Sequence, residues 1–271
     1  MQNFNELRFA VLIDADNVPY SNVKGMMEEI AKYGTPTFKR IYGDWTKQTV
    51  AGWKSVLLEN AITPIQQYSY TTGKNSTDSA MIIDAMDILY TGKVDGFCII
   101  SSDSDFTRLA LRLREAGVKV IGMGQKKTPS PFIAACDKFI YIEILSQVTE
   151  TIPEATEQLS KEENKKEGTQ RSNTVKHLYQ KTIQLIASSI SDLADESGWA
   201  FLGDVGTMLL KKHPDFDPRN YGFKKLGQLI KSTKHFDIDE RQTDKSNIKL
   251  VYIKAKPVNK NNAAGKRSAR K

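Results

Sequence analysis

The sequence has few of the residues that build zinc sites, disulfides or histidine-based catalysis. It contains two cysteines and three histidines among 271 residues, and these are scattered along the chain. Cys98 lies in an apolar run, where a free cysteine behaves as a small core residue. We therefore expect neither a disulfide nor a zinc site.

Long hydrophobic runs are also missing. No apolar stretch reaches the about 18 residues that suggest a membrane-spanning helix. The first residues, MQNFNELRFAVLI, lack the basic segment and long apolar stretch of a secretion signal. With 39% hydrophobic residues, the chain can still build a core. These features predict a cytoplasmic protein without membrane contact.

Excess positive charge is absent from the first part of the chain. Residues 1–149 contain 16 basic and 16 acidic residues, and residues 150–170 contain three and six. Residues 171–271 contain 20 basic and 10 acidic residues, so they account for the formal net charge of +7. This asymmetry predicts that the C-terminal part contacts nucleic acid or another anionic surface.

The order of apolar patterns predicts two domains. Strand and helix patterns alternate through residues 1–147, which predicts an α/β domain with a mostly parallel sheet flanked by helices. Residues 148–172 are polar and charged and are expected to form a flexible linker. Residues 173–254 follow the helix–helix–helix–hairpin outline of a small winged-helix (α+β) domain, and residues 255–271 are expected to be a basic, disordered tail.

Apolar spacing also predicts the bounds of individual elements. We expect helices over residues 20–33, 46–61, 75–92 and 218–233, and strands over residues 62–70 and 138–145.

Four aspartates stand where predicted buried strands end or a predicted helix begins: Asp14, Asp78, Asp103 and Asp105. A carboxylate buried inside a strand is costly, whereas the carboxyl edge of a parallel sheet is where open α/β folds place their sites. Carboxylates gathered at one edge repel each other unless a cation neutralises them, and oxygen ligands suit Mg²⁺ or Mn²⁺. The pattern predicts a metal site that acts on phosphate esters.

Several residues near these aspartates have two interpretations. Asp16 follows Asp14 by two residues and faces the same ion if the strand continues, but DADN is also a turn sequence. Asp105 either joins the site or only caps the helix that follows. Asp84 lies on a different face of its helix from Asp78, and Asp84 and Asp87 are expected to be solvated or structural. Lys74 contacts a phosphate or is an ordinary loop lysine.

The blocks IDADN, GKNSTDSAMIIDAMD, SSDSDF, VKVIGMG and CDKFIYI resemble the NYN domain, the PIN-like nuclease fold of the LabA-like group. The resemblance covers about residues 8–145 and implies a metal-dependent endoribonuclease that acts mainly on single-stranded RNA. It assigns catalytic and metal-binding roles to Asp14, Asp78, Asp103 and Asp105, and a catalytic role to Asn17. Asp137 matches the last block, as a site residue or as a cap.

The segment HPDFDPRNYGFKKLGQLIKST resembles the OST-HTH, or LOTUS, domain over about residues 175–254. This winged-helix family is associated with RNA binding or with protein partners in RNA metabolism. Four cations on or beside one predicted helix form a face suited to phosphates, or an ordinary solvated face: Arg219, Lys224, Lys225 and Lys231. Tyr221 either stacks on a base or packs in the core.

These observations favour a ribonuclease with a separate RNA-binding domain. Two alternatives remain open. One is a non-catalytic RNA-binding or adaptor protein with the same fold. The other is a haloacid-dehalogenase-like phosphatase, in which Asp14 is a nucleophile. The sequence leaves the number of ions and the oligomeric state open. Trp45, in the GDWTK loop, is the aromatic residue best placed to stack on a base.

Overall fold

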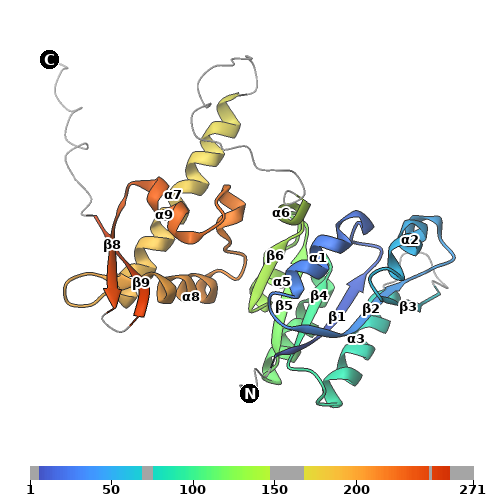
Figure 1. Ribbon diagram of the computed structural model, residues 1–271. Coiled ribbons are helices and arrows are strands. Elements are labelled where there is room, and N and C mark those ends of the chain that lie inside the picture. Colours follow the sequence, from blue (N-terminus) through green and yellow to red (C-terminus); the bar gives the residue numbers. More distant parts are fainter. Residues whose placement is uncertain (1–5, 69–75, 147–167, 244–245, 257–271) are drawn as a thin grey trace. The chain divides into compact units, whose positions relative to one another are not determined.

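The computed structural model describes residues 6–68, 76–146, 168–243 and 246–256 (Figure 1). The chain divides into two compact units, each of which is described by itself. The first comprises Met1–Ser160 and Leu210–Asp217, and the second comprises Lys161–Leu209 and Pro218–Lys271.

A six-stranded sheet forms the centre of the first unit. Its strands are β1 (Arg8–Asp14), β2 (Thr35–Gly43), β3 (Thr63–Gln66), β4 (Gly96–Ile100), β5 (Lys119–Gly124) and β6 (Lys138–Tyr141). Every neighbouring pair is parallel, and the strand order is β3-β2-β1-β4-β5-β6. The predicted α/β fold with a mostly parallel sheet is therefore confirmed. Strands β2 and β3 follow one another on one side of β1, and β4, β5 and β6 follow one another on its other side, so the strand order reverses between β1 and β4. Open α/β sheets bind ligands at such a point.

Both faces of the sheet are covered, so residues 9–13 of β1 and all of β4 are apolar. In β1, Phe9, Val11 and Ile13 enter one core, whereas Ala10 and Leu12 enter the other. This alternation follows from the two-residue period of a strand, and burial on both faces is typical of parallel sheets.

The helices divide between these two faces (Figure 1). The first core receives side chains from α1 (Val23–Ile30), η2 (Gln48–Trp53), α2 (Lys54–Leu57) and α6 (Glu143–Ser146). The second core receives side chains from α3 (Ser76–Tyr90), α4 (Thr107–Glu115) and α5 (Ser130–Ala135). Two short 3-10 turns complete this unit, η1 (Tyr20–Asn22) before α1 and η3 (Ser104–Phe106) before α4.

Two expected helices of this unit begin as 3-10 turns. The helix expected over residues 20–33 begins as η1, and the helix expected over residues 46–61 consists of η2 followed by the four residues of α2. Gly52, in η2, lies under the ring of Tyr20, and a Cβ at that glycine would come within 2.4 Å of the ring. Glycine is also a weak helix former, which explains why the second segment does not continue as one long α-helix.

The two strands expected near the sheet edges are shorter than predicted. Of the strand expected over residues 62–70, Thr63–Gln66 form β3, residues 67–68 are not in a strand, and residues 69–70 lie outside the described residues. The strand expected over residues 138–145 ends as β6, because the chain then turns into α6 and buries Ile144 and Leu145 against the first core.

The second unit combines helices with a three-stranded antiparallel sheet of order β7-β9-β8. Its elements are α7 (Gly168–Leu193), β7 (Ala200–Phe201), most of α8 (Leu202–Lys212, of which residues 210–212 are grouped with the first unit), η4 (Pro218–Tyr221), α9 (Leu226–Thr233), β8 (Phe236–Thr243) and β9 (Ser246–Ala255). Helix α7 begins inside the segment expected to be a linker, whereas residues 147–167 and the expected tail from residue 257 lie outside the described residues.

One predicted helix of this unit is interrupted. Residues 218–233 form η4 and α9 instead of a continuous helix. Gly222 adopts a φ of 82°, in the left-handed region that favours glycine, and Lys225 has an extended backbone before α9. None of the helices in the described ranges combines the length and apolar character needed to cross a bilayer.

Candidate metal and active site

Asp14 ends β1 and is almost completely buried, with 1% of its surface exposed. Its Oδ2 accepts hydrogen bonds from Asn17 Nδ2 and Ser101 Oγ, both at 2.7 Å. Its Oδ1 accepts a hydrogen bond from the Asp16 amide at 3.1 Å. Burial raises the pKa of Asp14, and these hydrogen bonds oppose the increase because they stabilise the carboxylate. The structure therefore places Asn17 beside Asp14, where it orients the carboxylate.

Ser101 connects the ends of β1 and β4 across the point where the strand order reverses. Its side chain is fully buried and donates to Asp14, while its Oγ accepts a hydrogen bond of 3.0 Å from the Asp103 amide. Ser101 was not among the residues expected from the sequence. The feature of the sequence that could have indicated it is the pair of hydroxyl side chains directly after a buried strand, in IISSD.

Three carboxylates from two separate segments meet at this edge. Asp78 lies in the first turn of α3, and Asp103 and Asp105 lie at η3, after β4. Each offers an oxygen, and these oxygens all lie within 4.8 Å of one another. Hard divalent cations such as Mg²⁺ and Mn²⁺ take carboxylate oxygens at this kind of spacing, so the side chains fit such an ion.

Asp103, rather than Asp105, caps the turn after β4. Asp103 is the N-cap residue of η3, and its Oδ1 accepts a hydrogen bond of 2.9 Å from the Asp105 amide. The capping role that the sequence left open for Asp105 therefore belongs to its neighbour. The carboxylate of Asp105 is exposed and belongs to the three-oxygen set.

The cluster is electrostatically unfavourable without a cation. Burial and then the charges of Asp14, Asp103, Asp105 and Asp16 raise the pKa of Asp78 to about 6. Like charges and a low-dielectric environment both disfavour ionisation of a carboxyl group. A bound divalent ion would reverse this effect by neutralising the local charge.

Asp14 and Asp16 lie beside this set and do not belong to it. Among the neighbouring charges, that of Asp14 has the largest effect in raising the pKa of Asp78. Residues 15–17 form a turn, so the two-residue period of a strand does not extend to Asp16. The carboxylate of Asp16 instead approaches Thr77 Oγ1, at 3.4 Å.

The other acidic candidates have structural partners. Asp84 Oδ2 accepts hydrogen bonds from Arg40 Nη1 at 2.7 Å and Tyr42 Oη at 2.9 Å, which connects α3 to β2. Asp137 Oδ2 accepts the Val120 amide at 2.8 Å, near the start of β5. Asp84 therefore has a structural role, which is one of the two alternatives expected for it, and Asp137 lies away from the carboxyl edge.

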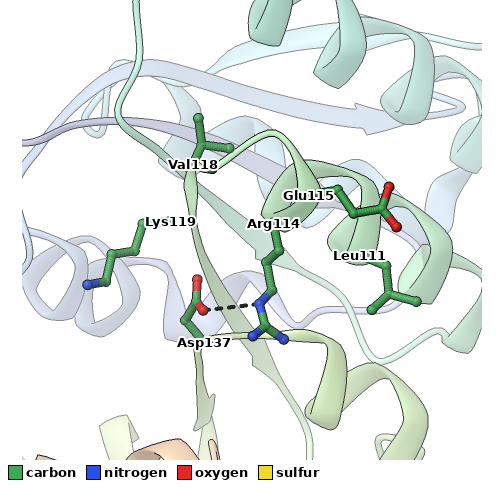
Figure 2. Close-up of a pocket in the computed structure, with 7 residues that line it drawn as sticks. Leu111, Arg114, Glu115, Val118, Lys119 and Asp137 are labelled. Atoms are coloured by element: carbon green, nitrogen blue, oxygen red, sulfur yellow. Dashed lines mark ion pairs between the residues drawn. The ribbon is translucent and has the colours of Figure 1, made fainter.

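Asp137 also helps to line a surface pocket at the amino edge of the sheet, where the strands begin. It forms an ion pair with Arg114 Nε at 3.1 Å (Figure 2). The lining residues are Leu111, Arg114, Glu115, Gly117, Val118, Lys119 and Asp137. Because Lys119 is the first residue of β5, this pocket lies at the end of the strand opposite to the carboxylate cluster.

Comparison with known families decides the identity of the first unit. The NYN domain family matches residues 8–143, which is half of the chain. The chain belongs to the NYN domain family. The NYN domain is a PIN-like nuclease fold, and its carboxyl edge here carries the four aspartates that the sequence singled out. A second family, the OST-HTH/LOTUS domain, matches residues 173–248.

Solved structures show weaker likenesses. A protein of unknown function from Vibrio parahaemolyticus is 20% identical, with 52% of this chain and 96% of that chain covered and a TM-score of 0.43. An uncharacterized protein from Nitrosomonas europaea is 30% identical, with 40% and 91% covered and a TM-score of 0.27. At these TM-scores the likenesses carry no argument about this chain. Among curated proteins, none matches it significantly.

The aromatic candidate of the NYN domain is engaged in packing. Trp45 is partly buried against the first core, and its indole Nε1 donates to the Ile65 carbonyl at 3.0 Å. Its amide also donates to Gln66 Oε1 at 3.0 Å. These contacts hold Trp45 against β3 and leave its side chain only partly exposed.

The cations predicted in the OST-HTH/LOTUS domain do not share one helix. Arg219 lies in η4, Lys224 and Lys225 are exposed before α9, and Lys231 lies in α9. The reason is the break at Gly222, which the sequence pattern did not reveal.

Two of the predicted RNA contacts have other partners in the fold. Lys231 Nζ lies 3.5 Å from Glu240 Oε1, in an exposed ion pair. Tyr221 Oη accepts a hydrogen bond of 3.1 Å from Thr182 Oγ1, so its hydroxyl is tied to α7. Lys74 lies outside the described residues.

Proposed function

We propose that this protein is a metal-dependent endoribonuclease that cleaves mainly single-stranded RNA, with an OST-HTH/LOTUS domain that holds the RNA. The observation that carries the proposal is the meeting of Asp78, Asp103 and Asp105 within 4.8 Å at the carboxyl edge of the NYN sheet. The strand order reverses at this edge, between β1 and β4, and such a point is where open α/β sheets place their ligands.

The aspartates divide into ligands and a supporting group. Asp78, Asp103 and Asp105 would hold Mg²⁺ or Mn²⁺, with Asp14 close enough to add negative charge or to bind through a water molecule. When bound, such an ion neutralises phosphate charge and makes water a stronger nucleophile. Asn17 and Ser101 keep the Asp14 carboxylate oriented through two hydrogen bonds of 2.7 Å. Oriented supporting groups of this kind tune metal sites.

The geometry favours this reaction over a phosphatase that uses Asp14 as a nucleophile. Both oxygens of Asp14 already accept hydrogen bonds, and only 1% of the residue is exposed. A nucleophile must reach the phosphorus atom directly, whereas a group that acts through a metal or water does not.

The OST-HTH/LOTUS domain supplies the second part of the proposal. OST-HTH/LOTUS domains bind RNA, and the segment from residue 171 onward carries 20 basic against 10 acidic residues. Lys224 and Lys225 are exposed beside α9 and are the cations best placed for phosphate contacts. Tethering to the NYN domain raises the concentration of bound RNA near the aspartates.

Cleavage of labelled single-stranded RNA tests the proposal. Purified full-length protein is incubated with Mn²⁺, with Mg²⁺ or with chelator, and products are resolved by length. We expect cleavage only with metal, and a loss of roughly 100-fold or more in Asp103→Asn or Asp14→Asn, because a metal contributes several kcal/mol to the transition state.

Asp87→Asn is the matched control. Asp87 is exposed on α3, the helix that also carries Asp78, but it lies outside the cluster. Normal activity in Asp103→Asn would refute the assigned site. RNA binding without any metal-dependent cleavage would instead indicate a non-catalytic adaptor.

A further inference from the structure

The outer face of the antiparallel sheet in the second unit carries a group of planar side chains that pack against one another. Arg241, in β8, lies over the ring of Tyr252, in β9, with 4.1 Å between the guanidinium carbon and the ring centroid. The same guanidinium lies 5.7 Å from the ring of Trp199. Phe201, in β7, packs against Tyr252 with 5.8 Å between ring centroids. We call these four residues the stacking platform.

The strand pattern places these side chains on the solvent side of the sheet. Ile253 is fully buried, so its neighbour Tyr252 points to the opposite face. The paired positions Phe201↔Tyr252 and Asp239↔Tyr252 bring β7 and β8 to the same face. Trp199, Phe201 and Tyr252 are partly exposed, and Arg241 is exposed. Core packing therefore does not account for all of this aromatic surface.

The loop that carries Trp199 is held in place. Asp195 Oδ1 accepts hydrogen bonds from the amides of Ser197 and Trp199, both at 2.9 Å, and from Ser197 Oγ at 2.7 Å. Lys254 Nζ donates to the Ser197 carbonyl at 2.8 Å. A loop whose backbone is held in this way loses little conformational entropy when it binds a ligand.

The charges on this face favour a base over a phosphate. Arg241 is paired with Asp239 at 2.8 Å, so its charge is largely compensated. A planar guanidinium and aromatic rings still offer π-faces on which any nucleobase stacks. The surplus of basic residues elsewhere in this part of the chain complements the phosphates on either side of such a base.

We propose that the stacking platform binds an unpaired base of single-stranded RNA. Trp199 and the guanidinium of Arg241 provide the contact surface, and Tyr252 and Phe201 support them from below. This inference rests on the proposed function because it takes RNA as the ligand. It adds a base-binding site, separate from the cations near α9, that supplies affinity with little dependence on salt.

An oligonucleotide without bases separates stacking from phosphate binding. The full chain is titrated, in chelator to prevent cleavage, with a fluorescent 12-nucleotide single-stranded RNA or with an abasic ribose-phosphate chain of the same length. We expect the RNA to bind at least about 5-fold more tightly, because stacking contributes roughly 1–3 kcal/mol per base. RNA binding should also quench the fluorescence of Trp199.

Three substitutions then locate the effect. Trp199→Ala should weaken RNA binding by about 5- to 150-fold without changing abasic binding, whereas Trp199→Phe should retain part of the affinity because it keeps a ring. Arg241→Lys keeps the charge but loses the planar group, so it should also weaken RNA binding and leave the salt dependence unchanged. Gln242→Ala, an exposed neighbour of Arg241, is the matched control.

The outcomes distinguish this inference from the proposed function. Two results would overturn base binding by the stacking platform alone: equal binding of RNA and abasic chain, or unchanged RNA affinity in folded Trp199→Ala and Arg241→Lys. A protein partner would then be the remaining candidate for this surface. Failure of the wild-type chain to bind either oligonucleotide would overturn both. Thermal melting of each variant shows whether a lower affinity reflects unfolding.

Discussion

Ser101 and Asp14 are joined by a buried hydrogen bond of 2.7 Å, although 87 positions separate them in the sequence. The same serine oxygen accepts the amide of Asp103. A single hydroxyl group therefore links the β1 carboxylate to the loop that carries two other aspartates. This link explains how two distant segments form one site.

Removal of this hydroxyl tests the link. Ser101→Ala should reduce cleavage by roughly 10- to 100-fold, as loss of groups that orient metal ligands does, and should lower the free energy of unfolding by about 1–3 kcal/mol. Ser104→Ala, an exposed serine of the next turn, is the control. Cleavage rates with Mn²⁺ and urea denaturation provide the measurements. Full activity in Ser101→Ala would show that Asp14 needs no such support.

Neutralisation of Asp78 should stabilise the metal-free protein while it abolishes cleavage. The pKa of Asp78 is raised to about 6, so at pH 7 to 8 its ionised form is disfavoured by the fold. Asp78→Asn removes that unfavourable charge and should raise the melting temperature in chelator.

The raised pKa of Asp78 also determines how the stability of the fold changes with pH. An acid whose folded pKa is raised binds its proton more tightly in the folded state, so stability decreases as pH rises from about 4 through about 6. The melting-temperature difference between Asp78→Asn and wild type should therefore disappear below about pH 4. A difference that stays constant over this range would contradict the raised pKa.

Divalent metal should stabilise the wild-type fold. An ion at 100 times its dissociation constant adds about 2.7 kcal/mol to the free energy of unfolding, so Mn²⁺ should raise the melting temperature. Asp103→Asn should lose most of this increase because it removes one of the three oxygen ligands. Asp87→Asn should keep it. Equal increases in all three proteins would place the ion elsewhere.

The lysines before α9 should control the salt dependence of RNA binding. Replacing both Lys224 and Lys225 by glutamine should lower affinity and make the slope of log K against log salt shallower by about 0.7 for each phosphate that a lysine no longer neutralises. Lys231→Gln should have a smaller effect, because Lys231 is paired with Glu240. An unchanged slope in the double variant would exclude these two lysines from phosphate binding.

Much of the NYN domain could be predicted from the sequence because its central elements carry strong local patterns. Residues 9–13 of β1 and the whole of β4 are continuous apolar runs, and α3 lies within the helix expected there. Prediction was weaker where tertiary packing or backbone geometry overrides propensity. The ring of Tyr20 over Gly52 shapes η2, and Gly222 separates η4 from α9. Neither feature leaves a periodic pattern in the sequence.

The candidate site was only partly predictable for the same reason. The four aspartates stood out because each lies at the end of a strand or the start of a helix. Ser101 did not, because its role depends on the pairing of β1 with β4, where Ile13 faces Ile100. The stacking platform was also missed, since it needs the short strand β7 beside β9.

The sequence by itself determined the α/β class and the concentration of positive charge in the C-terminal part, and it singled out the aspartates proposed for the site. These properties follow from composition and from patterns within single elements. Only the tertiary structure decided that Asp78 meets Asp103 and Asp105, that Asp103 is the cap, and that Asp14 is held behind them by Ser101. The physical reason is that strand order and register bring distant segments together, and no local pattern specifies these contacts.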